Sequence, residues 1–462
     1  MISNLCGTML AEAELFTNFC ATELPVSVSG ARTVLSLGAS DMLVLERGSY
    51  QVSWLKDTDQ DGLADSIENL VVLDNDDHLT HGLAIEEGHL YASSSSAVYR
   101  WPVDLEDLSA SQGQTPQVVI SNMNADGNGG APLGHRTRTL AFDSHGLLYV
   151  TIGSNDNIDL DSFRARIRRF NISDSTTFPL DFSTGQVFAE GLRNVVGLAF
   201  DKFGVLWGME NGADDLNRTD LGGDIHDNNP SEELNRFPEA QAGLTWGYPY
   251  CWSEYQLPEN YSNGTNSIWA WPDFMNDGIH TDQWCRANTQ PSELSMQAHS
   301  APLGITFYQY NPNPVPSCAG SFPAWMDGYA FIAFHGSWNR EPPTGYKVVF
   351  VQMNANGRIP TNVNSPNDLL KHQGSNAQWQ DGFRPVDVAF DACGRLLVTS
   401  DGTEGQGSKL VLIAYTADPT TNVMPDLTLT TTNSISSKQF LLFNSWVLLV
   451  VTTFFLCART WN

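Results

Sequence analysis

Short apolar strands recur in pairs along this chain, and each pair is joined by a turn that contains glycine or aspartate. Within a pair the apolar residues alternate with polar ones or run for a few positions, which is typical of antiparallel strands. Six copies begin near Ala31, His81, Thr137, Val195, Leu303 and Pro385. A spacing of roughly 50 to 60 residues, with no helical pattern between copies, is typical of β-propeller blades. The predicted fold is all-β, a six-bladed β-propeller.

A long insertion rich in Asn, Asp, Pro and Trp separates two of the predicted blades, from Asp214 to Cys285. Two interpretations of its aromatic residues are open. Exposed tryptophan and tyrosine faces stack well on sugar rings, so the insertion would form one wall of a carbohydrate site. Alternatively, the same side chains pack together as the core of a long loop.

The chain divides into four parts by composition. Residues 1–20 lack the basic start and clean apolar run of a signal peptide, and residues 21–417 contain the predicted blades. A Thr/Ser-rich linker at 418–438 precedes a hydrophobic tail at 439–462, in which residues 440–458 form an apolar run. Such a tail is interpreted as a cleaved glycolipid-anchor signal, as a membrane anchor, or as an artefact.

The chain is strongly acidic, with a formal net charge of -28. This charge repels phosphate backbones, so no nucleic-acid partner is expected. Acidic excess also keeps exported proteins soluble. Because Lys and Arg together number only 24, the places where they gather are informative.

The cysteines and the glycosylation sequons favour a secretory route. None of the seven cysteines forms a CxxC motif, which argues against zinc ribbons, thioredoxin chemistry and c-type haem. Cys251 and Cys285 bracket one aromatic loop and are the expected disulfide. Sequons occur at Asn171, Asn217, Asn260 and Asn263. The protein is therefore expected to be a glycoprotein, secreted or at the cell surface, and membrane-attached if the tail is an anchor.

Cationic and imidazole groups recur where the predicted blades begin or end. Taken singly, such a residue beside a strand is usually structural, but here the positions recur over four blades: His135, Arg136, Arg138, Arg193, Asn194, His335, Arg340 and Arg384. If they converge they form a positive pocket for a small polyanion, because guanidinium groups pair bidentately with carboxylates. A histidine within the pocket would accept a proton from a hydroxyl.

Several segments together resemble the glucose/sorbosone dehydrogenase family: GHRTRTLAFDSHGLLYVTIGSND, GLRNVVGLAFDKFGVLWGMENGADDL, AGLTWGYPYCW, APLGITFY, FIAFHGSWNR and DGFRPVDVAF. The resemblance runs from about residue 30 to 415. Members of that family are six-bladed propeller enzymes that use pyrroloquinoline quinone (PQQ) and calcium. The resemblance implies a quinoprotein that oxidises an aldose, a pyranose or a sorbosone-like sugar, at the anomeric carbon or the aldehyde, with hydride transfer to the PQQ.

The resemblance also implies roles for individual residues. His135 matches the catalytic histidine that removes the proton of the sugar hydroxyl. Arg193 and Asn194 match a pair that contacts the cofactor, and Arg384 matches an arginine that binds a cofactor carboxylate. The backbone carbonyls of Gly212 and Ala213 match those that hold the calcium ion. Oxygen ligands suit calcium.

This chain departs from the family pattern at several positions. Gly134 and Val386 replace an aspartate and an arginine of the best-studied soluble members, and Ala213 replaces a common proline. Where some members use a lysine to bind the cofactor, this chain offers His335 or Arg340. These departures bear on cofactor affinity and on substrate choice.

A second predicted metal site is independent of the family. Asp57, Asp59, Asp61, Gly62, Asp65 and Glu68 fit the loop positions of the calcium-binding pattern DxDxDG. Strand-like segments flank the loop, so a calcium-stapled hairpin is expected in place of an EF-hand. The alternative is an acidic turn without metal.

Three functions remain open at this level. The leading hypothesis is the PQQ-dependent sugar dehydrogenase, an oxidoreductase that acts on CH–OH groups. No cytochrome is visible in the chain, so the electrons pass to a separate acceptor. The alternatives are a non-catalytic extracellular propeller that has lost the cofactor and a calcium-centred hydrolase of the lactonase type.

Overall fold

The computed structural model describes residues 5–421 except 8, 40, 74–76, 124–133, 174, 176, 314–317, 355, 357–358, 362–365, 375–376 and 404–405. The hydrophobic tail at 439–462 and the linker beyond residue 421 lie outside the described residues. Among the described residues, no helix is both long enough and apolar enough to cross a bilayer.

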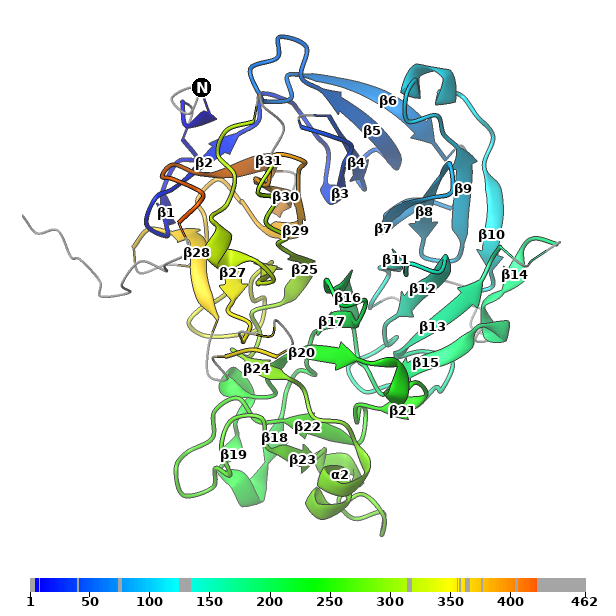
Figure 1. Ribbon diagram of the computed structural model, residues 1–462. Coiled ribbons are helices and arrows are strands. Elements are labelled where there is room, and N and C mark those ends of the chain that lie inside the picture. Colours follow the sequence, from blue (N-terminus) through cyan, green and yellow to red (C-terminus); the bar gives the residue numbers. More distant parts are fainter. Residues whose placement is uncertain are drawn as a thin grey trace, which may run out of the picture. The chain divides into compact units, whose positions relative to one another are not determined.

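Six sheets of four or five strands follow one another around a common axis (Figure 1). The innermost strand of each sheet contacts the innermost strands of its neighbours, and the last sheet contacts the first. This arrangement confirms the predicted six-bladed β-propeller.

Blades one to three use strands up to residue 245. Blade one contains β3 (Ala31–Ser36), β4 (Met42–Glu46), β5 (Gln51–Lys56) and β6 (Ser66–Val72). Blade two contains β7 (Leu79–Glu86), β8 (His89–Ser94), β9 (Val98–Pro102), β10 (Gln117–Ser121) and β14 (Leu180–Asp181). Blade three contains β11 (Leu140–Phe142), β12 (Leu147–Ile152), β13 (Arg166–Asn171), β15 (Gln186–Glu190) and β21 (Leu244–Thr245).

Blades four to six complete the ring. Blade four contains β16 (Val195–Phe200), β17 (Leu206–Glu210), β20 (Glu232–Phe237) and β24 (Leu294–Met296). Blade five contains β25 (Pro302–Phe307), β26 (Ala330–Phe334), β27 (Lys347–Val351), β28 (Asn367–His372) and β1 (Ala13–Leu15). Blade six contains β29 (Pro385–Phe390), β30 (Leu396–Thr403), β31 (Gln406–Tyr415) and β2 (Phe19–Glu23).

The amino-terminal segment closes the ring. Strand β2 pairs antiparallel with β31, placing Phe19 opposite Tyr415, and β1 pairs with β28 of blade five. A disulfide joins Cys6 to Cys20 beside this seam. Part of the segment that the sequence left outside the propeller therefore supplies outer strands to two blades.

The core lies between neighbouring sheets. Leu43 and Val52 of blade one pack with Leu83 and Trp101 of blade two, and all are fully or almost fully buried. The alternation seen in the sequence directs these side chains into the gap between blades, where burial of apolar surface stabilises the ring.

The segment from Asp214 to Cys285 follows β17, but it is not wholly an insertion between blades, because it supplies β20 to blade four and β21 to blade three. The remainder has its own small core. It contains the pairs β18 (Asn217–Arg218) with β19 (Gly223–Asp224) and β22 (Cys251–Ser253) with β23 (Ile268–Ala270), and helix α2 (Asp282–Asn288). Trp252, Trp269 and Trp271 are only 4 to 6% exposed. These tryptophans therefore support the loop-core interpretation.

The predicted disulfide between Cys251 and Cys285 is confirmed, and a further one joins Cys318 to Cys393.

Candidate functional site

A cavity of about 740 Å³ lies where the loops of blades three to six meet near the axis. Its lining includes most of the residues that the sequence predicted for the site: His135, Arg193, Asn194, Gly212, His335 and Arg384. The predicted convergence of blade-edge residues from four blades is therefore observed.

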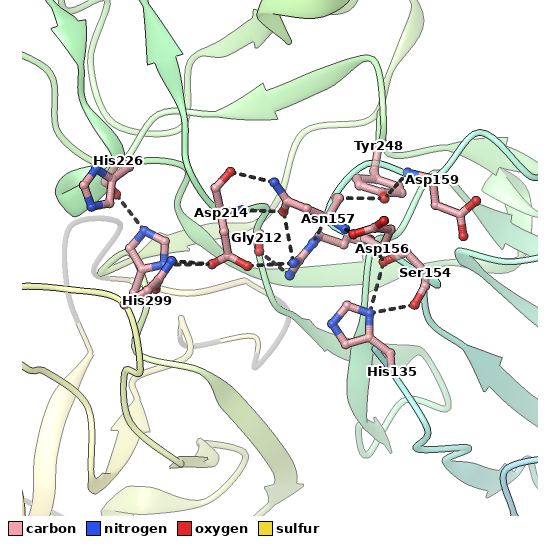
Figure 2. A network of polar contacts seen from close by, with 12 residues as sticks. His135, Ser154, Asp156, Asn157, Asp159, Gly212, Asp214, His226, Tyr248 and His299 are labelled. Carbon is pink, nitrogen blue, oxygen red and sulfur yellow. Dashed lines mark hydrogen bonds and ion pairs between the residues drawn. The ribbon is translucent and has the colours of Figure 1, made fainter. Parts of the chain in front are cut away.

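His135 presents one unprotonated ring nitrogen to this cavity. Its Nδ1 lies 2.9 Å from the carbonyl oxygen of Ser154, and because a carbonyl only accepts, Nδ1 carries the proton (Figure 2). In the neutral ring Nε2 then keeps its lone pair. Burial, and next the charge of Arg193, lower the pKa of His135 to about 3. His135 is thus neutral near pH 7, and Nε2 is able to accept a proton.

Gly153 makes room for His135 and Asn194 at the end of β12. A Cβ atom at this position would lie 2.7 Å from both the Cβ of His135 and the Oδ1 of Asn194. The Oδ1 of Asn194 is buried and has no hydrogen-bond partner within the described residues. Such an orphaned acceptor at a cavity wall suits a bound ligand that donates to it.

Arg193 forms hydrogen bonds to the loop that contains Gly212 and Asp214. Its Nη1 donates to the carbonyl oxygen of Gly212 at 2.6 Å, and its Nη2 donates to Asp214 at 2.8 Å and to Asn157 at 3.1 Å. The guanidinium group is therefore largely used within the protein, and it positions the Gly212 loop.

Asp214, His299 and Glu232 also line the cavity and were not predicted as site residues. Asp214 lies 3.4 Å from Nδ1 of His299, and Figure 2 shows the polar network that they share with Gly212 and Asn157. Burial lowers the pKa of His299, but Asp214 and Glu232 raise it overall. Burial raises the pKa of Glu232 to about 7. His299 stands just before an innermost strand, as His135 and Arg384 do, and this position was the signal available in the sequence.

His335 and Arg384 lie next to each other at the axis. His335 Nε2 pairs with Asp401 at 2.8 Å, and burial lowers the pKa of His335. Arg384 donates from Nε and Nη2 to the carbonyl oxygens of His335 and Gly336. Its Nη1 has no hydrogen-bond partner among the residues that the structure describes, which leaves a cationic donor at the cavity.

Four predicted residues lie outside the lining of this cavity: Arg136, Arg138, Ala213 and Arg340. Arg138 is fully buried, and its Nη1 donates to the carbonyl oxygens of His135 and Thr137. Arg340 donates to the carbonyl oxygen of Asp227 at 2.7 Å and to Asn228 at 3.0 Å, so it ties two loops together. The side chain of Ala213 is 6% exposed and packs in the core of the insertion.

The charge of the cavity differs from the positive pocket that the sequence suggested. Four carboxyl groups share the lining with the cations: Asp156, Asp214, Asp215 and Glu232. Asp156, Asp214 and Asp215 lie in loops and Glu232 begins β20, whereas the pattern in the sequence concerned only cationic and imidazole groups. The cavity is therefore of mixed charge.

The predicted calcium loop between β5 and β6 gathers only some of its acidic residues. Carboxylate oxygens of Asp57, Asp59 and Asp61 lie within 4.8 Å of one another. Asp65 instead accepts hydrogen bonds from Thr58, and Glu68 pairs with Lys56 at 2.6 Å. The strand-flanked hairpin is as expected, and calcium binding there stays a prediction.

Comparison with known proteins adds to this geometry. The chain matches the profile of the TrAA12-like family over residues 14–412. It is 30% identical over 393 residues to a pyrroloquinoline quinone-dependent pyranose dehydrogenase of Coprinopsis cinerea, covering 79% of this chain and 50% of that protein. It thus spans about half the length of that relative. It is 31% identical over 403 residues to a pyrroloquinoline quinone-dependent sugar dehydrogenase of Hypocrea jecorina, covering 82% and 85% of the two chains.

The fold agrees with a solved structure as well. The holo form of the PQQ domain of the Coprinopsis cinerea pyranose dehydrogenase superposes with a TM-score of 0.72 at 27% identity. The match covers 87% of this chain and 97% of that domain. With the profile match over most of its length, the chain belongs to the TrAA12-like family.

Proposed function

We propose that this protein is a PQQ-dependent sugar dehydrogenase that oxidises an aldose, a pyranose or a sorbosone-like sugar at its anomeric carbon or aldehyde. The observation that carries the proposal is His135, a neutral base whose Nε2 borders a cavity of about 740 Å³. A cavity of this size has room for a ligand of the size of the cofactor. The names of the relatives from Coprinopsis cinerea and Hypocrea jecorina support the same chemistry.

The residues present fit the quinone. PQQ carries three carboxylates, and when bound it supplies the two-electron acceptor for the reaction. Arg384 offers a cationic Nη1 that would donate to a carboxylate, and Oδ1 of Asn194, which has no partner in the described chain, would accept from the pyrrole N–H of the quinone. We infer that these two side chains hold the cofactor, with His335 beside them. Arg340 has no part in this site because its guanidinium group is used elsewhere.

His135 acts on the sugar. Its Nε2 accepts the proton of the anomeric hydroxyl, while the hydrogen on the anomeric carbon leaves with its electron pair and a carbonyl forms. The carbonyl oxygen of Ser154 holds the Nδ1 proton and so keeps the ring in the tautomer that the step needs. The proton acquired by His135 is stabilised by the negative charge of Asp214, which raises the pKa of the histidine against the larger effect of burial.

A calcium ion would be held by backbone carbonyls of Gly212 and Ala213. The carbonyl oxygen of Gly212 also accepts a hydrogen bond from Arg193, and its second lone pair remains for an ion. Carbonyl oxygen is a ligand type that calcium prefers. Removal of calcium with a chelator is expected to lower PQQ affinity and activity together, and added calcium to restore both.

The alternatives are less well supported. A hydrolase of the lactonase type needs acidic and amide side chains that are free to bind an ion, but Asp214 is paired with Arg193, and Glu232 accepts from the backbone amides of Gly212 and Ala301. A non-catalytic binding protein would have no need of the His135 geometry.

We also propose that the protein enters the secretory pathway and passes its electrons to a separate acceptor. Three disulfides favour an oxidising compartment. The four sequon asparagines, Asn171, Asn217, Asn260 and Asn263, are all exposed. A glycosidase that removes N-linked glycans should lower the mass of the protein purified from its natural source, and an unchanged mass would contradict this proposal. Attachment to a membrane through the tail remains part of the proposal.

The central experiment titrates the purified protein with PQQ in the presence of calcium and follows dye reduction with a panel of aldoses. We expect quenching of tryptophan fluorescence on cofactor binding and sugar-dependent reduction of the dye. Absence of PQQ binding would reject the enzyme and leave the binding-protein alternative.

A further inference from the structure

A second cavity, of about 960 Å³, lies on the other side of His135. The loops of blades one to three supply most of its lining, and it shares His135, Asn194 and His335 with the first cavity. The proposed base therefore borders two spaces. If one holds the cofactor, the other has room for the molecule that gives up its proton.

Two arginines of this second cavity form no ion pair with a residue that the structure describes. Arg47 and Arg136 both line it, both are exposed, and neither pairs with a carboxylate in the described chain. They are close enough to affect each other, since burial, then Arg32 and then Arg136, lower the pKa of Arg47 despite the opposing charge of Asp401. In a chain with a net charge of -28, two cations that lack a carboxylate partner among the described residues are unusual, and they favour an anionic ligand.

The other charged side chains that line the second cavity, Arg32 and Asp77, already have partners within the protein. Arg32 pairs with Asp401 at 2.8 Å. Asp77 accepts hydrogen bonds from the hydroxyl groups of Ser94, Ser96 and Tyr99 at 2.6 to 2.7 Å. Arg47 and Arg136 are therefore the groups available to a ligand.

An aromatic surface stands in the same cavity. The rings of Tyr50 and His78 stack with their centroids 3.8 Å apart and an angle of 11° between their planes. Both residues line the cavity and are exposed. Flat rings of this kind pack against the apolar faces of sugar rings.

We propose that the second cavity is the substrate subsite, in which Arg47 and Arg136 bind a carboxylate of the sugar, and that the preferred substrates are sugar acids of the uronic acid class. Guanidinium groups match carboxylates in geometry and form charge-assisted hydrogen bonds with them. This inference rests on the proposed dehydrogenase function, because His135 must act on the anomeric hydroxyl of the same molecule.

The step is balanced without a further reactant. The anomeric O–H bond breaks and its proton goes to Nε2 of His135, and the C–H bond at the same carbon breaks with its electron pair passing to the quinone. A C=O bond forms at the anomeric carbon, so the uronic acid becomes the 1,5-lactone of the corresponding aldaric acid. The carboxylate held by the arginines is not changed.

The test compares glucuronate with glucose, which differ only in a carboxylate or a hydroxymethyl group. The PQQ-loaded protein is expected to oxidise glucuronate with the higher kcat/KM, and its KM for glucuronate should rise with ionic strength while that for glucose does not. Arg47→Gln and Arg136→Gln should each raise the KM for glucuronate by about tenfold or more. Their KM for glucose should change much less than that for glucuronate, and they should still bind PQQ.

Two controls sharpen the result. Lys202→Gln removes the same charge at a residue that lines neither cavity and pairs with Asp327, and it should alter neither KM. Arg136→Lys keeps the charge without the planar fork and should recover part of the loss.

The proposal is overturned if glucuronate has no advantage, if both arginine variants behave as wild type, or if they lose affinity for PQQ, since the arginines would then serve the cofactor. Failure of the proposed function looks different, because the wild-type protein would not bind PQQ at all. Calorimetry of glucuronate with the quinone-free protein tests the subsite in that case. Binding that weakens in Arg47→Gln and Arg136→Gln supports the subsite, and equal or absent binding rejects it.

Discussion

At the scale of single residues, the chemistry depends on which polar atoms remain unused after folding. Ser154 occupies Nδ1 of His135, so Nε2 is left for a substrate. The guanidinium group of Arg193 donates to Gly212, Asp214 and Asn157, whereas Nη1 of Arg384 has no partner among the described residues. The sequence located these side chains correctly at the blade edges. It did not show which of their atoms face the cavity, because the hydrogen-bond partners come from other loops.

Replacement of His135 by Ala should abolish most turnover while leaving PQQ affinity nearly intact. The loss in kcat should be about 10²- to 10⁴-fold, the usual contribution of a general base. The low pKa of about 3 also predicts that kcat/KM does not fall from protonation of His135 between pH 7 and 5. Stopped-flow reduction of the bound quinone measures the step. His145→Ala, at an exposed turn, is the control, and full activity in His135→Ala would refute the assignment.

Gly153→Ala should impair the site without a comparable change in the surrounding blade. The added methyl group would lie 2.7 Å from both His135 and Asn194, so these side chains must shift. We expect weaker PQQ binding and lower kcat, measured by fluorescence titration and dye reduction. Gly38→Ala is the matched control because a Cβ there meets nothing within 4 Å. Normal kinetics in Gly153→Ala would mean that the site tolerates displacement of both side chains.

At the scale of elements, the hydrophobic pattern predicted the strands, but it did not predict which distant elements contact one another. The innermost strands begin at Ala31, Val195 and Pro385 as predicted, and the third begins at Leu140, a few residues after Thr137. The aromatic insertion was recognised from composition, but both roles for its tryptophans stayed open. Trp252 and Trp269 lie opposite each other on β22 and β23, and both are buried. Their packing therefore supports the interpretation that they form the core of the insertion.

Removal of the disulfide in the insertion should cost stability more than function. The double variant Cys251→Ser/Cys285→Ser releases a closed loop and should lower the free energy of unfolding by about 2 to 4 kcal/mol. Neither cysteine lines the cavity of His135, so PQQ affinity should be retained. Urea denaturation and fluorescence titration measure the two effects. An unchanged urea midpoint would show that the core of the insertion holds without the bond.

At the scale of the whole molecule, the ring is closed by contacts between its first and last blades. Asp387 on β29 accepts a hydrogen bond from the backbone amide of Val34 on β3 at 3.1 Å, and Arg32 pairs with Asp401. Strand β2 adds the outer edge of blade six. These contacts join residues from opposite ends of the chain, so a local pattern does not reveal them.

Asp387 predicts how stability at this seam depends on pH. Burial raises its pKa to about 7 from an ordinary value of 3.8. The folded protein therefore keeps this proton over a range in which the unfolded chain has lost it, and the wild type loses stability from this group as pH rises through that range. Asp387→Asn removes the dependence. Its free energy of unfolding relative to wild type should rise between pH 5 and pH 8, measured by urea denaturation.

The exposed variant Asp104→Asn is the control for this measurement and should show no such trend. A constant difference between Asp387→Asn and wild type across the same range would mean that the carboxyl group is ionised in the folded protein.

The sequence by itself determined the repeat, the number of blades, the family and the positions of His135, Arg193, Asn194 and Arg384, because these depend on local alternation and on short motifs. Only the tertiary structure showed the role of β2 and the carboxylates Asp214 and Glu232 in the cavity. It also placed Arg47 and Arg136, which have no ion-pair partner among the described residues, in the second cavity. Charge balance and cavity shape arise from loops of different blades that meet near the axis. Their distances are set by the packing of the ring as a whole, which no single segment encodes.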